Sequence, residues 1–110
     1  MNEIKAYIRP ALGHKVIGAL KAAGITNLSV IHVKGIGVFE DPQTEKYDAE
    51  IIEKSSDMLK IEIICRRKDV ERYVEILKQG AYTGKPGDGA IFVSSVERAV
   101  KIRSGEEGIE

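Results

Sequence analysis

Two stretches of this chain follow the same order of strand, helix and strand, and a long polar segment separates them. Apolar and polar residues alternate with the period of a half-buried strand in four places, and apolar residues recur at helical spacing in two. The predicted strands are 3–9, 25–38, 58–66 and 90–96, and the predicted helices are 12–23 and 69–80, with Gly24 and Gly80 as stops. This order predicts one α+β domain over 1–110, a ferredoxin-like βαββαβ sandwich with a four-stranded antiparallel sheet and both helices on one face.

In an isolated copy of the chain, apolar side chains on the sheet face away from the helices would be exposed to water. On the alternation pattern, Tyr7, Ile31, Val33 and Ile64 point toward that face. Exposed apolar faces and strand edges favour association. We therefore expect this small domain to assemble with further copies of itself.

Two segments break the pattern of strands and helices. Residues 39–57 are polar and charged, and the loop that they belong to, 37–57, is long for a compact domain. This segment is either solvated and without fixed structure or a surface that folds on a partner. A tail of residues 97–110 follows the last strand; 97–104 could add one strand, and 105–110 is expected to fray.

Composition narrows the functional class. Among 110 residues, 17 are basic and 17 acidic, and the resulting net charge of zero argues against a nucleic-acid partner. No apolar run approaches the roughly 20 residues that span a bilayer. Residues 1–3 lead directly into a strand, so we expect no signal peptide and a cytoplasmic location. A single cysteine, Cys65, excludes an internal disulfide, and we expect it to be a buried core residue.

The glycine-rich segment that precedes the last strand is the strongest candidate site. Residues 83–93 read Thr-Gly-Lys-Pro-Gly-Asp-Gly-Ala-Ile-Phe-Val. Glycines let the backbone adopt positive φ, and successive amides in such a turn can hold an anion. Lys101 and Arg103 follow in the tail. The pattern predicts a phosphate site, whereas a simple turn and a solvated basic edge are the alternatives that the residues alone leave open.

The chain resembles the PII signal-transduction proteins, a family of trimeric nitrogen regulators. The resemblance rests on Thr83 followed by Gly87-Asp88-Gly89-Ala90-Ile91-Phe92-Val93, where only Ala90 departs from the family pattern. Further matches are Ile8-Arg9-Pro10, Gly24-Ile25-Thr26, Val33-Lys34-Gly35-Ile36-Gly37, Lys60-Ile61-Glu62-Ile63 and Ile102-Arg103-Ser104-Gly105-Glu106. These matches occur in order along nearly the whole chain.

This resemblance implies a homotrimer that binds adenine nucleotides (ATP, ADP or AMP, with Mg²⁺ accompanying ATP) in clefts between subunits. It places the phosphates on the loop 84–89 and on Lys101 and Arg103 of the neighbouring subunit. The full set of nucleotide-binding positions that it implies is Tyr7, Ser29, Gly35, Ile36, Gly37, Val38, Glu62, Ile64, Thr83, Lys85, Gly87, Asp88, Gly89, Ala90, Lys101 and Arg103. It also implies that the loop 37–55 docks on a target protein, a membrane transporter or a metabolic enzyme.

Several positions depart from the family pattern. Tyr7 is bulkier than the usual aliphatic residue, and Val38 and Ala90 stand where basic residues usually contact phosphate, which favours ADP or AMP over ATP. Phe39 and Met58 replace a glutamine and a lysine that serve 2-oxoglutarate binding, so the sequence does not support a response to that acid. Uridylylation is equally unsupported, because the modified tyrosine of relatives aligns with Ile51.

Two functions other than that of a binding module are alternatives. An enzyme with weak nucleotide hydrolysis would need a general base or a Walker motif, and residues 80–86 lack the spacing of that motif. A metal-tolerance trimer similar to the CutA proteins would share the fold. His14, His32 and Cys65 do not have metal-ligand spacing, which argues against a metal site. We therefore expect a regulator without catalytic residues.

Overall fold

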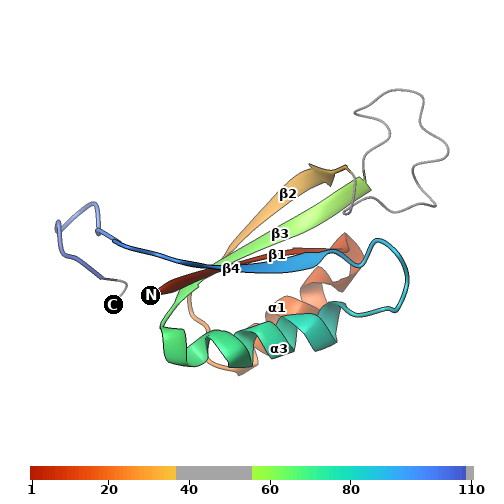
Figure 1. The fold of residues 1–110 in the computed structure, drawn as a ribbon, viewed down its shortest axis with the longest axis horizontal. Coiled ribbons are helices and arrows are strands. Elements are labelled where there is room, and N and C mark those ends of the chain that lie inside the picture. The colour runs from red at the N-terminus through yellow and green to blue at the C-terminus, as the bar shows by residue number, and fades with distance from the viewer. Residues whose placement is uncertain (37–55, 109–110) are drawn as a thin grey trace.

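The computed structural model describes residues 1–36 and 56–108, and these form a four-stranded sheet with two helices on one face (Figure 1). All neighbouring strands are antiparallel, in the order β2-β3-β1-β4. The predicted ferredoxin-like βαββαβ fold is therefore confirmed. The elements are β1 (Asn2–Ile8), η1 (Pro10–Leu12), α1 (Gly13–Ala22), β2 (Ser29–Gly35), β3 (Ser56–Cys65), η3 (Arg67–Asp69), α3 (Val70–Ala81) and β4 (Ala90–Ser95).

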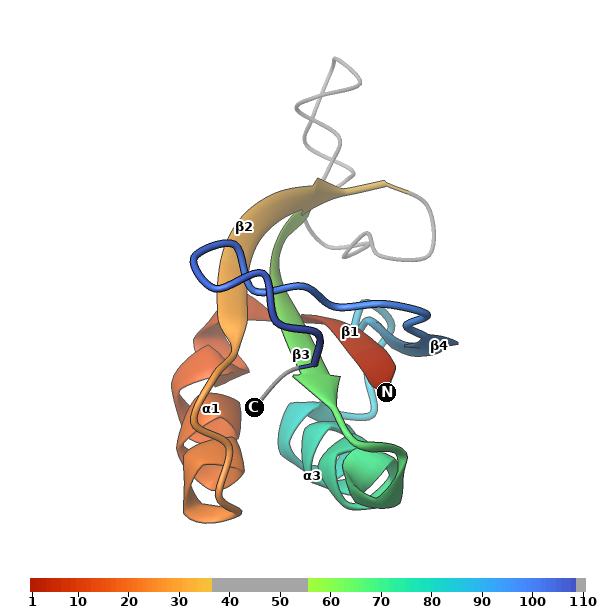
Figure 2. The same cartoon turned by 90° about the vertical axis from the view of Figure 1, so that its left-hand side faces the viewer.

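The core lies between the sheet and the two helices (Figure 2). Alternate residues of the two central strands point into it, as the period-two pattern predicts. The fully buried members include Ile4 and Ile8 of β1, Ile61 of β3, Leu20 of α1 and Leu77 of α3. Cys65 also lies in this core as expected, with 5% of its surface exposed. Burial of these side chains fixes which face of each strand meets the helices.

The opposite face of the sheet is not covered by any helix of the described chain (Figure 2). Ile31, Ile64 and Phe92 are 40%, 39% and 50% exposed on it, which agrees with the predicted direction of the first two. Tyr7 meets Phe92 edge to face, with ring centroids 6.0 Å apart. Apolar side chains therefore lie on this face as the sequence predicted, together with the ion pairs Lys5–Glu3 and Lys60–Glu62.

Residues 25–28 are not part of a strand, so the predicted strand 25–38 begins too early. Gly24 has a φ of 101°, which ends α1, and the Ile25 amide then donates to the carbonyl of Leu20 at 3.2 Å. Ile25 is consequently buried beneath the sheet instead of pairing in it. The strand itself starts at Ser29 and ends at Gly35.

Gly80 does not end the second helix, which continues to Ala81. A Cβ at Gly80 would lie 2.9 Å from Cγ2 of Val16 on α1. The glycine therefore serves close packing between the helices, and a helix-stop interpretation is wrong. The first helix likewise differs from prediction, because a 3-10 turn, η1, precedes α1.

The structure differs from the predicted boundaries of the loop, 37–57, and from the predicted structure of the tail, 97–110. Ser56 and Asp57 belong to β3, so the loop is shorter than 37–57, and residues 37–55 lie outside the described chain. The tail forms no further strand; it folds into a hairpin with one bridge, between Val100 and Glu107. Arg98 also pairs with Glu107 at 2.5 Å. Residues 105–108 are therefore held in the hairpin and do not fray.

None of the helices in residues 1–36 and 56–108 has the length and apolar content needed to cross a bilayer.

Candidate functional site

The glycine turn, residues 83–89, connects α3 to β4 and is fixed against β1 by a close backbone contact. Gly84, Gly87 and Gly89 have φ values of 85°, 98° and 102°, a region that other residues rarely adopt. A Cβ at Gly89 would lie 1.7 Å from the carbonyl oxygen of Tyr7. Only glycine can therefore occupy this position without moving the turn.

Asp88 is the centre of the hydrogen bonds that close the glycine turn. Its carboxylate accepts the amides of Thr83 and Gly84 at 2.8 and 2.9 Å and also the Thr83 hydroxyl. Nε of Arg9 donates to the same carboxylate at 3.1 Å. Burial would raise the pKa of Asp88, but these hydrogen bonds outweigh it and lower the pKa from 3.8 to about 2. Asp88 is thus charged at neutral pH and points into the turn.

The backbone amides at the end of the glycine turn are available to a ligand. Within residues 1–36 and 56–108, the amides of Gly87 and Gly89 donate no hydrogen bond to the protein. The turn at Pro86 and Gly87 directs the Asp88 amide toward the carbonyl of Lys85. Gly87 is half-buried and Gly89 is exposed. Unsatisfied amides in a turn of positive φ can donate to an anion such as a phosphate.

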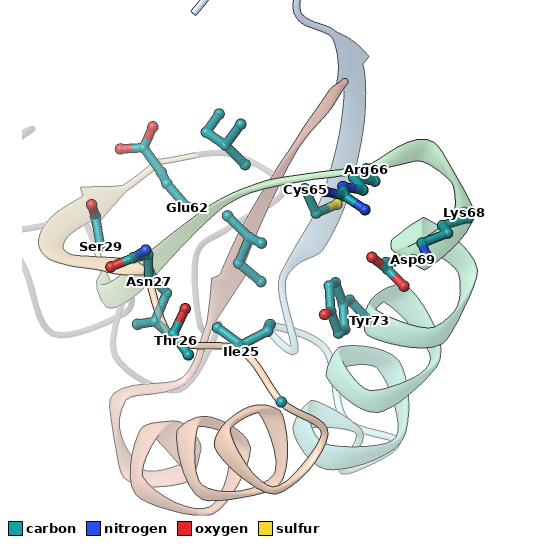
Figure 3. Close-up of a pocket in the computed structure, with 14 residues that line it drawn as sticks. Ile25, Thr26, Asn27, Ser29, Glu62, Cys65, Arg66, Lys68, Asp69 and Tyr73 are labelled. Carbon is teal, nitrogen blue, oxygen red and sulfur yellow. The ribbon is translucent and has the colours of Figure 1, made fainter. Parts of the chain in front are cut away.

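A second candidate region, the end pocket, lies where β2 begins and β3 ends (Figure 3). It is a cavity of about 630 Å³. Ser29 and Glu62 stand opposite each other on paired strands, and Tyr73 and Asp69 approach from α3 and its preceding turn. The lining residues are Gly24, Ile25, Thr26, Asn27, Leu28, Ser29, Glu62, Ile63, Ile64, Cys65, Arg66, Lys68, Asp69 and Tyr73.

The tail presents its basic residues at the tip of a hairpin beyond the end of β4. The Lys101 amide donates to Glu106 at 2.9 Å, and the Gly105 amide returns to the carbonyl of Lys101 at 2.8 Å. This turn leaves Arg103 exposed and Ile102 fully exposed. The hairpin projects from the end of the sheet opposite the glycine turn (Figure 1).

The predicted site residues therefore fall into two groups at opposite ends of the sheet. Gly35 and Ile36 lie at the end of β2, and Tyr7 pairs with Ala90 beside the glycine turn, which holds Thr83, Lys85, Gly87, Asp88 and Gly89. Ser29, Glu62 and Ile64 line the end pocket, and Lys101 and Arg103 extend from that same end. Gly37 and Val38 lie outside the described residues.

Sequence reasoning missed Arg9 and most of the lining of the end pocket, including Thr26, Asn27, Asp69 and Tyr73. Arg9 reaches the glycine turn across 79 residues of chain, and no local pattern signals such a contact. The match of Ile8-Arg9-Pro10 to the family pattern was the available clue. Thr26 and Asn27 line the pocket because the positive φ of Gly24 directs the chain inward. Sequence reasoning missed them because it placed both residues in a strand.

The described residues offer no obvious site for a metal ion or a cysteine nucleophile. No group of three His, Cys, Asp or Glu side chains comes together within 1–36 and 56–108. Burial raises the pKa of the Cys65 thiol, and the charge of Asp69 adds to the effect. A protonated, buried thiol is a poor nucleophile.

The geometry defines an α+β domain of the ferredoxin-like class with a glycine turn at one end of its sheet. The model of the family "Nitrogen regulatory protein P-II" matches residues 1–106. The chain is 39% identical to nitrogen regulatory protein P-II 2 of Methanothermobacter thermautotrophicus, over 98% of this chain and 94% of that protein. It is 40% and 42% identical to the P-II proteins of Azospirillum brasilense and Rhodobacter capsulatus, each over 98% of this chain and 96% of the relative.

The chain therefore belongs to the P-II nitrogen regulatory protein family, and the predicted membership is confirmed. Members of this family are trimeric signalling proteins and not enzymes, which agrees with the expected regulator without catalytic residues. The family match disfavours the alternative of a metal-tolerance trimer similar to the CutA proteins.

The contact between Gly89 and Tyr7 yields a direct test. We expect Gly89→Ala to destabilise the fold or displace the turn, because the new methyl group would overlap the Tyr7 carbonyl. Gly24→Ala is the matched control, since its φ of 101° is similar but no atom lies within 4 Å of the added Cβ. Chemical denaturation should give a loss of about 1–2 kcal/mol for the control, from backbone strain alone, and a larger loss at Gly89. Equal losses would contradict the contact.

The low pKa of Asp88 predicts a stability loss in acid. Its folded pKa of about 2 lies below the ordinary 3.8, so its stabilising contribution is present above about pH 4 and is lost as the pH falls toward 2. Asp88→Asn removes this titration. Denaturation curves from pH 6 to pH 2 should show the wild-type protein more stable near neutrality and the difference shrinking in acid. A difference independent of pH would refute the assignment.

Proposed function

We propose that this P-II protein binds an adenine nucleotide in clefts between the subunits of a homotrimer and regulates a target protein through residues 37–55. The observation that supports this most is the separation of the candidate residues into two ends of one sheet. Gly35 and Ser29 are six residues apart on β2, which corresponds to about 20 Å of strand. A nucleotide held by both groups of residues fits best between two copies of the chain.

In this arrangement, the glycine turn of one subunit receives the phosphates. Its unpaired amides supply neutral donors, and the hairpin of the neighbouring subunit supplies the cations Lys101 and Arg103. Arg103 can contact two phosphate oxygens at once, whereas Lys101 acts as a point charge. The end pocket, with Ser29, Glu62 and Ile64 on its lining, offers polar and apolar contacts for the base and ribose.

The uncovered sheet face supports the homotrimer. Ile31, Ile64 and Phe92 are each 39–50% exposed in the single chain. Their burial against other copies would remove apolar surface from water. Mixed charges on the same face, such as Lys60 and Glu62 at 3.5 Å, can be satisfied in pairs as the face is covered.

Coupling between nucleotide and target rests on where residues 37–55 are attached. Gly35 pairs with Ser56, so both attachment points lie on neighbouring strands at the same end of the sheet as the glycine turn (Figure 1). A nucleotide at the turn would contact Ile36 and the residues that follow it. Different nucleotides would thereby favour different states of the segment, and a transporter or enzyme in contact with the cytoplasm would respond to them.

A response to 2-oxoglutarate is not part of this proposal. Met58 stands where the resemblance places a lysine for that acid, and its side chain is only 1% exposed. A Cβ at Gly89 would lie 3.3 Å from the Met58 methyl, so this thioether packs beneath the glycine turn. An apolar side chain at this place cannot pair with a carboxylate.

Calorimetric titration with AMP, ADP and ATP, each with Mg²⁺, tests the nucleotide site. We expect saturable binding of one nucleotide per chain, unchanged by 2-oxoglutarate. Arg103→Ala should weaken ADP binding by about 10- to 100-fold, because it removes a charged hydrogen bond to phosphate. Arg67→Ala, an exposed arginine outside both candidate regions, is the control and should bind as the wild type does. Absence of binding to all three nucleotides would refute the proposal.

The absence of a basic side chain at position 90 predicts the order of the affinities for AMP, ADP and ATP. Ala90 opens β4, pairs with Tyr7 and follows the glycine turn directly. Ala90→Lys places a positive charge beside the phosphates, so ATP binding should strengthen by about tenfold relative to AMP. Ala90→Gln controls for side-chain length without charge. If Ala90→Lys changes the affinities for AMP, ADP and ATP equally, the charge argument is wrong.

A further inference from the structure

Arg9 connects the glycine turn to the body of the domain by a fork of two hydrogen bonds. Nε donates to Oδ1 of Asp88 at 3.1 Å, and Nη2 donates to the carbonyl of Pro86 at 2.7 Å. Both acceptors belong to the turn, one as a side chain and one as backbone. Only about a fifth of the Arg9 side chain and a quarter of the Asp88 side chain are exposed. The pair is therefore shielded from solvent better than an ordinary surface ion pair.

The backbone of Arg9 is itself held in place. It is the last residue before the 3-10 turn η1, and its carbonyl accepts the amide of Leu12 at 3.0 Å. Pro10 follows and restricts the chain further. The guanidinium consequently extends from a fixed point at the end of β1, and two hydrogen bonds with planar fork geometry define its orientation.

The glycine turn needs such support for two reasons. Three glycines in residues 83–89 give the free chain many backbone conformations, so an ordered set of amides carries a high entropic cost. The turn also contains the negative charge of Asp88 beside the amides that would face a phosphate. The guanidinium addresses both, since it restrains the turn at Pro86 and neutralises the carboxylate.

We infer that Arg9 is a positioning residue for phosphate binding: its fork to Asp88 and Pro86 holds the glycine turn in the conformation that presents the amides of Gly87 and Gly89 to an anion. This inference rests on the proposed function, because it concerns the same site. The hydrogen bonds from Thr83 to Asp88 then close the turn from within, and neither residue has to contact the nucleotide.

The test compares Arg9→Met and Arg9→Lys with the wild type in two measurements on the same samples. Hydrogen exchange of the ligand-free protein reports on the turn through the amides of Thr83 and Gly84, which donate to Asp88. Titration with ADP and with adenosine separates phosphate recognition from base recognition, since adenosine has no phosphate. Arg67→Met is the matched control, an exposed arginine away from the turn.

We expect Arg9→Met to speed exchange at Thr83 and Gly84, to weaken ADP binding by about tenfold and to leave adenosine binding unchanged. Arg9→Lys should fall between, because lysine keeps the charge but cannot donate in fork geometry to both acceptors. Should Arg9→Met fail to fold, Arg9→Gln replaces it, because glutamine keeps an amide donor but has neither the charge nor the fork of donors that reaches both Asp88 and Pro86.

Three results would overturn the inference. Faster exchange with unchanged ADP affinity would show that phosphate binding does not need the fork. Equal losses for ADP and adenosine would mean a general structural defect. No binding of AMP, ADP or ATP by the wild-type protein would refute the proposed function and the positioning role together, while the exchange data would still show whether Arg9 restrains the turn.

Discussion

The approach of Gly89 to the carbonyl of Tyr7 is the contact on which the candidate site depends. It brings the start of β4 and the end of the glycine turn against the central strand β1, at a separation that no side chain permits. The hydrogen bonds of Asp88 then close the turn, and Arg9 ties it to the end of the same strand. Backbone packing, the hydrogen bonds of Asp88 and the Arg9–Asp88 ion pair thus all restrain the seven residues of the glycine turn.

The antiparallel sheet explains why the candidate residues lie at two opposite ends of one chain. β1 and β2 run in the same direction, so the ends of both lie near the glycine turn and the beginning of β2 lies at the end pocket. The tail leaves β4 at the pocket end. Residues with related chemistry are therefore distributed to opposite ends of the protomer, and repetition of the protomer around an axis can reunite them.

The sequence predicted the fold well where alternation was regular and failed where one backbone angle decided the path. Alternation over 58–66 identified the buried face of β3, including Ile61 and Cys65. Residues 25–28 look like a strand because Ile25 is β-branched, yet the positive φ of Gly24 turns them into the core. The candidate residues were named from motif resemblance, but their division into two ends, and the contact of Arg9 with Asp88, depend on tertiary topology that no local pattern contains.

The pairing of Gly35 with Ser56 has a consequence for how this family can diversify. Because the sheet itself fixes these two points side by side, the chain between them can lengthen, shorten or change sequence without altering the domain that carries it. Each doubling of such an insertion costs only about 0.6 kcal/mol in closure entropy. Sequence changes between these two points can therefore accumulate while the sheet and the glycine turn are inherited intact.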